Sequence, residues 1–269
     1  MEFLKLSRRG IHHPDETVRR RSFWEFTRFV RECKTEMNPD MAAPILESMR
    51  VSQNLHCVLC SANPQDLLVI NPVLVEADTP DEDVLLKAAT TPSYLTDQLH
   101  LFEAAGSLVY ITRSDTAKHM ALLEALAGPL MAAIGDGLQR PTEPLAILQV
   151  HHYLMALGNF AKGFPSVSDK QIEALPYTPA FKQMTEALLE ALNVMKTQRI
   201  VRDSARFAFS QFVTAIGSTI AELVPRFVSS VVTEFVASEL VDFILFLNLL
   251  MHRLKVRTRF LSATPLLTA

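Results

Sequence analysis

The sequence VRRRSFWEFTRFV (residues 18–30) indicates a repeat protein, because a matching sequence, VRDSARFAFSQFV, occupies residues 201–213. Both begin with Val-Arg, and Phe26, Phe29 and Val30 of the first align with Phe209, Phe212 and Val213 of the second. The apolar positions recur at steps of three and four residues, which is typical of one buried stripe on an α-helix. The copies begin 183 residues apart (18 to 201), close to four units of about 46 residues, within the ~40–47-residue range of HEAT and armadillo repeats.

A helix with a single apolar stripe needs a partner helix in its own unit and neighbouring units on either side. We therefore predict an all-α fold, an α-solenoid of HEAT-type antiparallel helix pairs. About five pairs and a truncated one fill residues 1–269 as one segment. In the first copy, the residues expected to face inward are Val18, Ser22, Phe26, Phe29, Val30 and Cys33. The alternative is that two amphipathic helices resemble each other by chance.

The composition favours helices over a β-rich fold. Only 8 of 269 residues are glycine, whereas 49% are hydrophobic, enough for a continuous core. The net charge of −3 means that any contact with phosphate must come from local patches. Three cysteines form no disulfide framework, and the first nine residues do not form a signal peptide. The apolar run at 240–251 is too short to span a membrane, which takes ~20 residues, so we expect a buried helix.

Three features in the first half break or shape the helical pattern. Residues 52–92 contain four prolines and a cluster of five acids, which predicts a long insertion loop within the solenoid segment. Just beyond it, Ala105 and Gly106 predict that a neighbouring helix can approach closely. A long helix over 116–136 is expected to bend at Pro129.

Motifs for catalysis or metal binding are weak. His56, Cys57 and Cys60 form a CxxC with one imidazole, but a closed zinc site needs four ligands and no second pair completes it. We interpret them as loop packing, with a metal site or redox chemistry as the alternatives. The doublets His12-His13 and His151-His152 place adjacent side chains on different sides of a helix. We therefore expect no enzyme, no metal and no cofactor.

Basic residues cluster in three places, and these are the candidate binding residues. They are Arg19, Arg20, Arg21 and Arg28 in the first copy, Arg202 and Arg206 in the second, and Arg253, Lys255 and Arg257 towards the end of the sequence. Stacked units place equivalent helices side by side, so such residues could line one surface for phosphate or an acidic partner. The alternative is that they are ordinary solvated helix faces.

Two longer stretches resemble a known family. RGIHHPDETVRRRSFWEFTRFVRECKTEMNP (residues 9–39) and DQLHLFEAAGSLV (residues 97–109) are similar to the exportin-T family, the tRNA-carrying branch of the karyopherin-β proteins. The Pro129-Leu-Met131 kink and the helices after it are similar in placement, whereas the 52–92 insertion departs from the family pattern. Family members are several times longer, so the resemblance implies an internal section.

The resemblance implies an α-solenoid that wraps tRNA together with GTP-bound Ran, contacts nucleoporins, and shuttles between nucleus and cytoplasm. It implies neither a membrane nor a small-molecule substrate. The first functional hypothesis is therefore a fragment of a tRNA export receptor that acts by binding. The second is a generic HEAT scaffold for protein partners without RNA. The third is an enzyme that uses His56, Cys57 and Cys60.

Overall fold

The computed structural model describes residues 9–50, 84–90, 94–167, 175–234 and 237–254. Within these ranges the chain is helical and contains no strand. The α-helices are α2 (Glu16–Cys33), α3 (Pro39–Arg50), α5 (Val84–Thr90), α6 (Tyr94–Ile111), α7 (Thr116–Leu138), α8 (Pro144–Lys162), α9 (Thr178–Val194), α10 (Arg199–Ile216), α11 (Val224–Val232) and α12 (Leu240–Leu254). Three 3₁₀ segments join them: η3 (Thr112–Ser114), η5 (Gly217–Leu223) and η6 (Ala237–Glu239).

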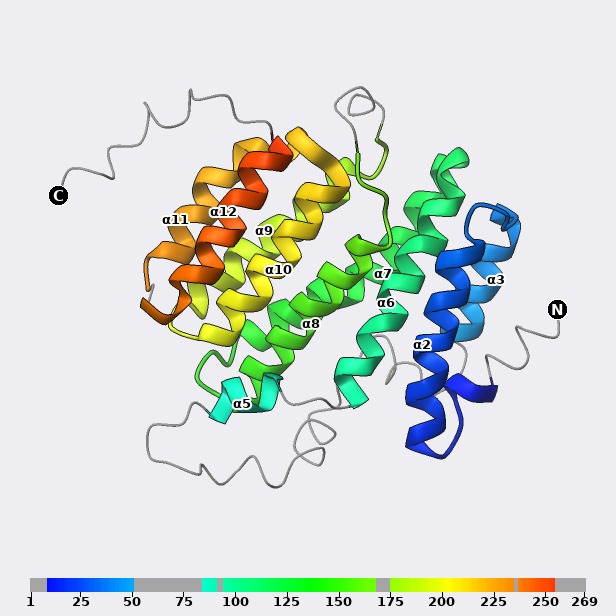
Figure 1. Cartoon of the computed structure of the whole chain (residues 1–269), viewed down its shortest axis with the longest axis horizontal. Coiled ribbons are helices and arrows are strands. Elements are labelled where there is room, and N and C mark those ends of the chain that lie inside the picture. Colours follow the sequence, from blue (N-terminus) through cyan, green and yellow to red (C-terminus); the bar gives the residue numbers. More distant parts are fainter. Residues whose placement is uncertain (1–8, 51–83, 91–93, 168–174, 235–236, 255–269) are drawn as a thin grey trace.

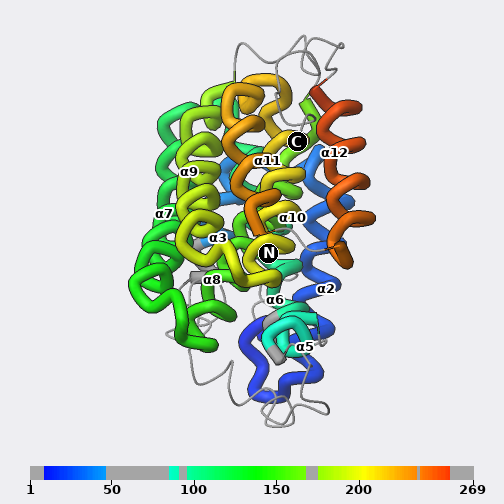
Figure 2. Tube along the Cα trace, turned by 90° about the vertical axis from the view of Figure 1, so that its left-hand side faces the viewer, coloured from blue at the N-terminus to red at the C-terminus, as the bar shows by residue number. Residues whose placement is uncertain are grey.

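The longer helices form two layers, seen face-on in Figure 1 and edge-on in Figure 2. We call α2, α6, α8, α10 and α12 the front layer, because each packs against the next in that order. The back layer holds α3, α7, α9 and α11, with α9 packed between α7 and α11. The chain alternates between the layers, as a helical solenoid requires. The predicted fold class is confirmed: the described ranges hold four front–back pairs followed by α12.

The spacing of the repeats differs from the prediction. The front-layer helices begin at residues 16, 94, 144, 199 and 240, so α2 and α10 lie three steps apart in this layer. The prediction of four equal units of about 46 residues was therefore wrong. The 183 residues between the two copies hold three units, and the first of these is longer because of the stretch between α3 and α6. Within the predicted 52–92 loop, residues 84–90 form α5, which packs on α8 and α10. The rest of that loop lies outside the described residues.

The two copies of the opening motif form α2 and α10, both in the front layer, but they are buried to different degrees. The middle helix α10 buries 13 of its 18 residues, whereas α2 buries four. Val201 is fully buried, while its counterpart Val18 is 39% exposed, so the inward placement predicted for Val18 was wrong. The reason is the position of each helix: α10 lies between α8 and α12 with α9 behind it, whereas α2 has α6 on one side.

Local sequence explains where several helices begin and end. The side chains of Asp15 and Asp115 accept hydrogen bonds from the backbone amides of Val18 and Lys118 and so cap α2 and α7. Pro144 occupies the first turn of α8, where its missing N–H costs nothing. Gly217, with a φ of 58°, ends α10 in a conformation that other residues rarely adopt.

Glycines let α6 and α8 approach closely, as Ala105-Gly106 predicted. A Cβ added to Gly106 would lie 2.9 Å from the carbonyl carbon of Phe160 and still closer to its oxygen. The backbone of Gly163, just after α8, is packed equally tightly against Glu103 and Ser107 of α6. Its carbonyl also accepts a hydrogen bond of 3.1 Å from the hydroxyl of Ser107. The backbones of the two helices are therefore in direct contact at this crossing.

Two stretches are long and apolar enough to cross a membrane by length and composition, at Thr116–Leu138 and Arg199–Val232. The first is the single helix α7, which packs on α8 and α9. The second is divided into α10, η5 and α11, and carries the buried cations Arg202 and Arg206. We interpret both as core helices of the two-layer array, because such helices meet the same length and hydropathy limits.

Candidate nucleic-acid interface

The second predicted basic cluster is buried. Arg202 and Arg206 of α10 both pair with Glu239 of η6, whose side chain is fully buried. Arg202 makes two hydrogen bonds to this carboxylate, and Arg206 also pairs with Asp203. Burial raises the pKa of Asp203, and the flanking arginines oppose that rise. The structure thus assigns Arg202 and Arg206 to an internal network that fixes the start of α12 on α10, and removes them from the candidate surface.

The Val-Arg pair that opens both copies has a structural role. Arg19 donates a hydrogen bond of 2.7 Å from Nη1 to the carbonyl of His13, six residues earlier. Arg202 donates one of 2.6 Å from Nη1 to the carbonyl of Lys196, again six residues earlier. Equivalent arginines therefore fasten the incoming loop to the first turn of each helix. Since Arg19 also donates to the carbonyl of Pro14, its guanidinium points at its own loop.

The outward surface of α2 carries two arginines around a tryptophan. The buried residues Phe23, Phe26 and Val30 mark the side of α2 that faces the core. At 100° per residue, Arg21, Trp24 and Arg28 fall on the opposite side. Trp24 is 43% exposed, and the guanidinium carbons of Arg21 and Arg28 lie 5.4 and 5.0 Å from its ring centre. The two arginines also pair with Glu25, and Arg28 with Glu32.

A second group of cations crosses from α2 to α8. Arg31 of α2 and Lys162 of α8 contact the two oxygens of the Glu103 carboxylate, at 2.7 and 2.9 Å. Glu103 is buried, whereas both cations are about half exposed. One carboxylate between two cations leaves a net charge of +1 across three neighbouring helices. Nearby, Arg20 pairs with Asp97 of α6.

We call Arg20, Arg21, Arg28, Arg31 and Lys162 the arginine face. Three of them were predicted as binding residues, and Arg31 belongs to the same basic helix. Lys162 and Trp24 were missed. Lys162 stands alone among apolar and small residues in the sequence, so only the contact of α6 with α8 reveals it. Trp24 was counted as part of an amphipathic helix, although its place between Arg21 and Arg28 at helical spacing was a usable signal.

The strength of its existing ion pair decides whether a cation can turn to a phosphate ligand. Exposed pairs such as Arg21–Glu25 contribute about 0–1 kcal/mol, so a phosphate can displace the carboxylate at little cost. Removing one partner of a buried pair such as Arg202–Glu239 costs about 3–5 kcal/mol. A ligand can therefore recruit Arg21 and Arg28 without opening the fold, and it can contact the half-exposed Arg31 and Lys162 while they stay paired with Glu103. It cannot recruit the α10 network.

The third predicted cluster is only partly described. Arg253 lies near the end of α12 and donates a hydrogen bond of 2.7 Å to the hydroxyl of Ser166. Lys255 and Arg257 lie outside the described residues, as do His56, Cys57 and Cys60. In the ranges that the structure covers, no group of three or more His, Cys, Asp or Glu side chains could hold a metal ion.

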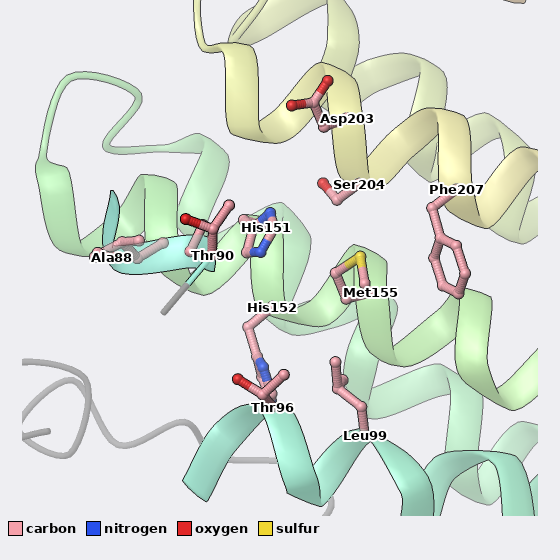
Figure 3. A pocket seen from close by; sticks show the side chains of 12 residues that line it. Ala88, Thr90, Thr96, Leu99, His151, His152, Met155, Asp203, Ser204 and Phe207 are labelled. Carbon is pink, nitrogen blue, oxygen red and sulfur yellow. The ribbon is translucent and has the colours of Figure 1, made fainter. Parts of the chain in front are cut away.

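A cavity of about 340 Å³ lies in the front layer between α5, α6, α8 and α10 (Figure 3). His151 and His152 line it, with His151 towards Asp203 of α10 and His152 towards Thr96 of α6. The imidazole of His151 lies 3.0 Å from the carbonyl of Ile200. Burial lowers the pKa of His152 to about 3, helped by the neighbouring His151, so His152 is neutral at physiological pH. A mostly apolar cavity, with two histidines and the carboxylate of Asp203 in its lining, suits packing better than phosphate recognition.

Comparison with known proteins places this arrangement in a family. A family model described as Exportin-T matches residues 1–263. The chain belongs to the Exportin-T family. It is 33% identical to Exportin-T of Mycosarcoma maydis over 252 residues and to that of Laccaria bicolor over 253 residues. Each match covers 92% of this chain and 22% of the relative. Exportin-T of Aspergillus niger is 29% identical over 249 residues, 89% of this chain and 22% of the relative.

The chain thus spans about a fifth of the length of the curated Exportin-T proteins that it matches. The resemblance seen in the two long sequence stretches is confirmed, and the match covers residues 1–263. Exportin-T proteins are karyopherins, transport receptors that act by binding. For a member of this family, the arginine face is the feature in the described part of the chain that best suits a polyanionic cargo.

Proposed function

We propose that this chain forms part of the cargo-binding surface of a tRNA exportin, with the arginine face contacting tRNA phosphates. The observation that carries the proposal is the placement of five exposed or half-exposed cations on one side of the front layer, across α2 and α8. Family membership supports tRNA as the cargo, and the exposure and placement of the arginine face support these residues as its contacts. Arg253, Lys255 and Arg257 stay candidate RNA-binding residues in this proposal.

The chemistry of the face suits backbone contacts. A-form RNA hides its base edges in a deep, narrow groove, so proteins recognise paired regions through phosphates and 2′-hydroxyls. Arginine offers a planar fork of donors that matches phosphate geometry. Because Arg31 of α2 and Lys162 of α8 both pair with Glu103 of α6, the helix between them, their positions relative to each other are fixed. Such contacts would supply affinity and depend steeply on salt.

We further propose that GTP-bound Ran is the second ligand of the complete receptor and that the receptor shuttles between nucleus and cytoplasm. Family membership supports both proposals. The described residues carry no feature that we assign to Ran, so the Ran contact is a property to be measured on the complex.

The test is fluorescence anisotropy of labelled tRNA titrated with the chain, with and without GTP-bound Ran, between 50 and 200 mM salt. We expect binding that weakens steeply over this range. Replacing Arg21 and Arg28 by glutamine should weaken binding and reduce the salt slope by about 1 for each lost phosphate contact. Arg226→Gln is the matched control, because Arg226 of α11, in the back layer, is a similarly exposed arginine that pairs with Glu186 of α9.

Two results would contradict the proposal. The first is an affinity for tRNA that does not respond to salt. The second is a loss of affinity in Arg226→Gln as large as in the Arg21→Gln, Arg28→Gln double variant. If the chain enriches proteins and no tRNA, the second hypothesis, a HEAT scaffold for protein partners, takes its place.

A further inference from the structure

Trp24 is the side chain on the arginine face that phosphate binding does not explain. It is the single tryptophan of the chain, and 43% of it is exposed on the outward side of α2. Large apolar side chains on a solvated helix usually turn towards the core, as Phe23 and Phe26 do. Trp24 instead lies between two arginines that are already satisfied by Glu25 and Glu32.

The surroundings of Trp24 resemble the platforms on which proteins stack nucleobases. Such platforms combine an accessible aromatic ring with cations that hold the nearby backbone. Here the guanidinium carbons of Arg21 and Arg28 lie 5.4 and 5.0 Å from the ring centre. Both side chains are half or more exposed, so a phosphate can draw either guanidinium away from the ring and uncover the indole. The flanking cations and the ring would then hold adjacent parts of one nucleotide.

We propose that Trp24 stacks on an unpaired base of the bound RNA, while Arg21 and Arg28 hold the phosphates on either side. This inference rests on the proposed function, since it names the part of the RNA that the arginine face meets. It adds a selectivity that phosphate contacts lack: an RNA with accessible unpaired nucleotides binds better than a fully paired duplex of similar length.

The position of Trp24 allows a direct measurement. Because the chain has one tryptophan, its intrinsic fluorescence reports on this site alone, and stacking of a base on indole quenches it. We expect saturating tRNA to quench the fluorescence, and a fully paired RNA duplex to leave it nearly unchanged. Anisotropy of labelled tRNA, measured on the same samples, reports binding independently of the tryptophan.

Substitutions give the second readout. Trp24→Ala should weaken tRNA binding about 5- to 100-fold, and Trp24→Phe should retain part of the affinity. For a fully paired RNA duplex, Trp24→Ala should bind with the same affinity as the parent chain. Val18→Ala is the matched control: it removes an exposed apolar side chain from the same helix, on a different side. Because Trp24 is exposed, circular dichroism should show both alanine variants to be folded like the parent.

The outcomes separate this inference from the proposed function. Salt-dependent tRNA binding without quenching, or with Trp24→Ala and Val18→Ala equal in affinity, would overturn the stacking role and leave the arginine face intact. Equal quenching by duplex and by tRNA would also overturn it, because it would show a change near the indole without base selectivity. An absence of tRNA binding by anisotropy overturns both proposals.

Discussion

The backbone contact between α6 and α8 gives the sharpest prediction about stability. In Gly106→Ala the new methyl group would lie 2.9 Å from the carbonyl carbon of Phe160 and closer still to its oxygen. Real Cβ atoms essentially never come within 3.0 Å of another heavy atom, and here the obstacle is backbone, which cannot rotate away. The two helices must therefore separate along their shared contact.

Two effects of opposite sign decide the outcome. Overpacking of this kind costs about 1–3 kcal/mol. Alanine in place of glycine within a helix gains about 0.5–1 kcal/mol. The steric cost is the larger of the two, so the free energy of unfolding should fall by about 1–2 kcal/mol. For a chain of this length that lowers Tm by about 2–8 °C. Loss of the α6–α8 contact should also loosen the pairing of Lys162 with Glu103.

Gly135→Ala is the matched control. Gly135 lies inside α7, and a Cβ added there meets nothing within 4 Å. The helix-propensity gain should then stand alone and raise stability by about 0.5–1 kcal/mol. Thermal and urea unfolding followed by circular dichroism at 222 nm measures both variants. If Gly106→Ala shifts the transition in the same direction as Gly135→Ala, the close contact between α6 and α8 does not exist and the reasoning fails.

Three further predictions concern the buried and half-buried polar groups. Burial lowers the pKa of His152 to about 3, below its ordinary value of 6.5, so the unfolded chain takes up the proton first. The free energy of unfolding should therefore fall as the pH drops below about 6.5 towards 3, by about 2 kcal/mol at pH 5. Urea unfolding of His152→Gln over the same pH range should show a smaller loss than the parent chain. Glu239→Gln should cost about 3–5 kcal/mol because it leaves Arg202 and Arg206 buried without their carboxylate. Glu222→Gln, at the exposed pair with Lys182, should change the unfolding free energy by at most about 1 kcal/mol; equal losses in the two would refute the buried network. Arg19→Gln should lower the free energy of unfolding by about 1 kcal/mol, because two hydrogen bonds to backbone carbonyls are lost, and should leave tRNA affinity unchanged. A change in tRNA affinity without a change in stability would show that Arg19 contacts the RNA.

The helical repeat could be predicted from the sequence because its signal is local. Steps of three and four residues place Phe26 and Val30 on one stripe, whatever lies elsewhere in the chain. The equivalence of α2 and α10 followed from the same pattern, and the structure places both in the front layer. The number of units between them did not follow. A count from spacing assumes equal repeats, and the stretch between α3 and α6 breaks that assumption.

Whether each arginine is exposed or buried could not be predicted from the sequence, because it depends on residues distant in sequence. Arg202 is buried by Glu239, 37 residues away, once η6 folds back on α10. Arg31 and Lys162 meet only because Gly106 and Gly163 bring α6 and α8 together. Charge clustering identifies which helices are basic. Whether a cation on such a helix is exposed, shared or enclosed is a property of the packed layers.

Comparison of the two copies separates the requirements of the fold from the features of the candidate interface. Phe26 and Val30 of the inner stripe recur in α10 as Phe209 and Val213, because either helix needs that stripe to pack in the front layer. The other side of the helix does not recur: the exposed Arg21, Trp24 and Arg28 of α2 correspond to Ser204, Phe207 and Gln211 of α10. In α10 the first of these is buried and the other two are partly buried, because α10 has neighbours on both sides. Since α10 forms an equally regular helix without those cations, packing does not require them in α2. Their presence there needs another cause, and a ligand that combines phosphate with an exposed base supplies one. Replacing Arg21, Trp24 and Arg28 of α2 by serine, phenylalanine and glutamine, the residues at the equivalent positions of α10, should therefore leave unfolding unchanged while it weakens tRNA binding. A loss of folding in that variant would show that the three residues of α2 serve the helix itself.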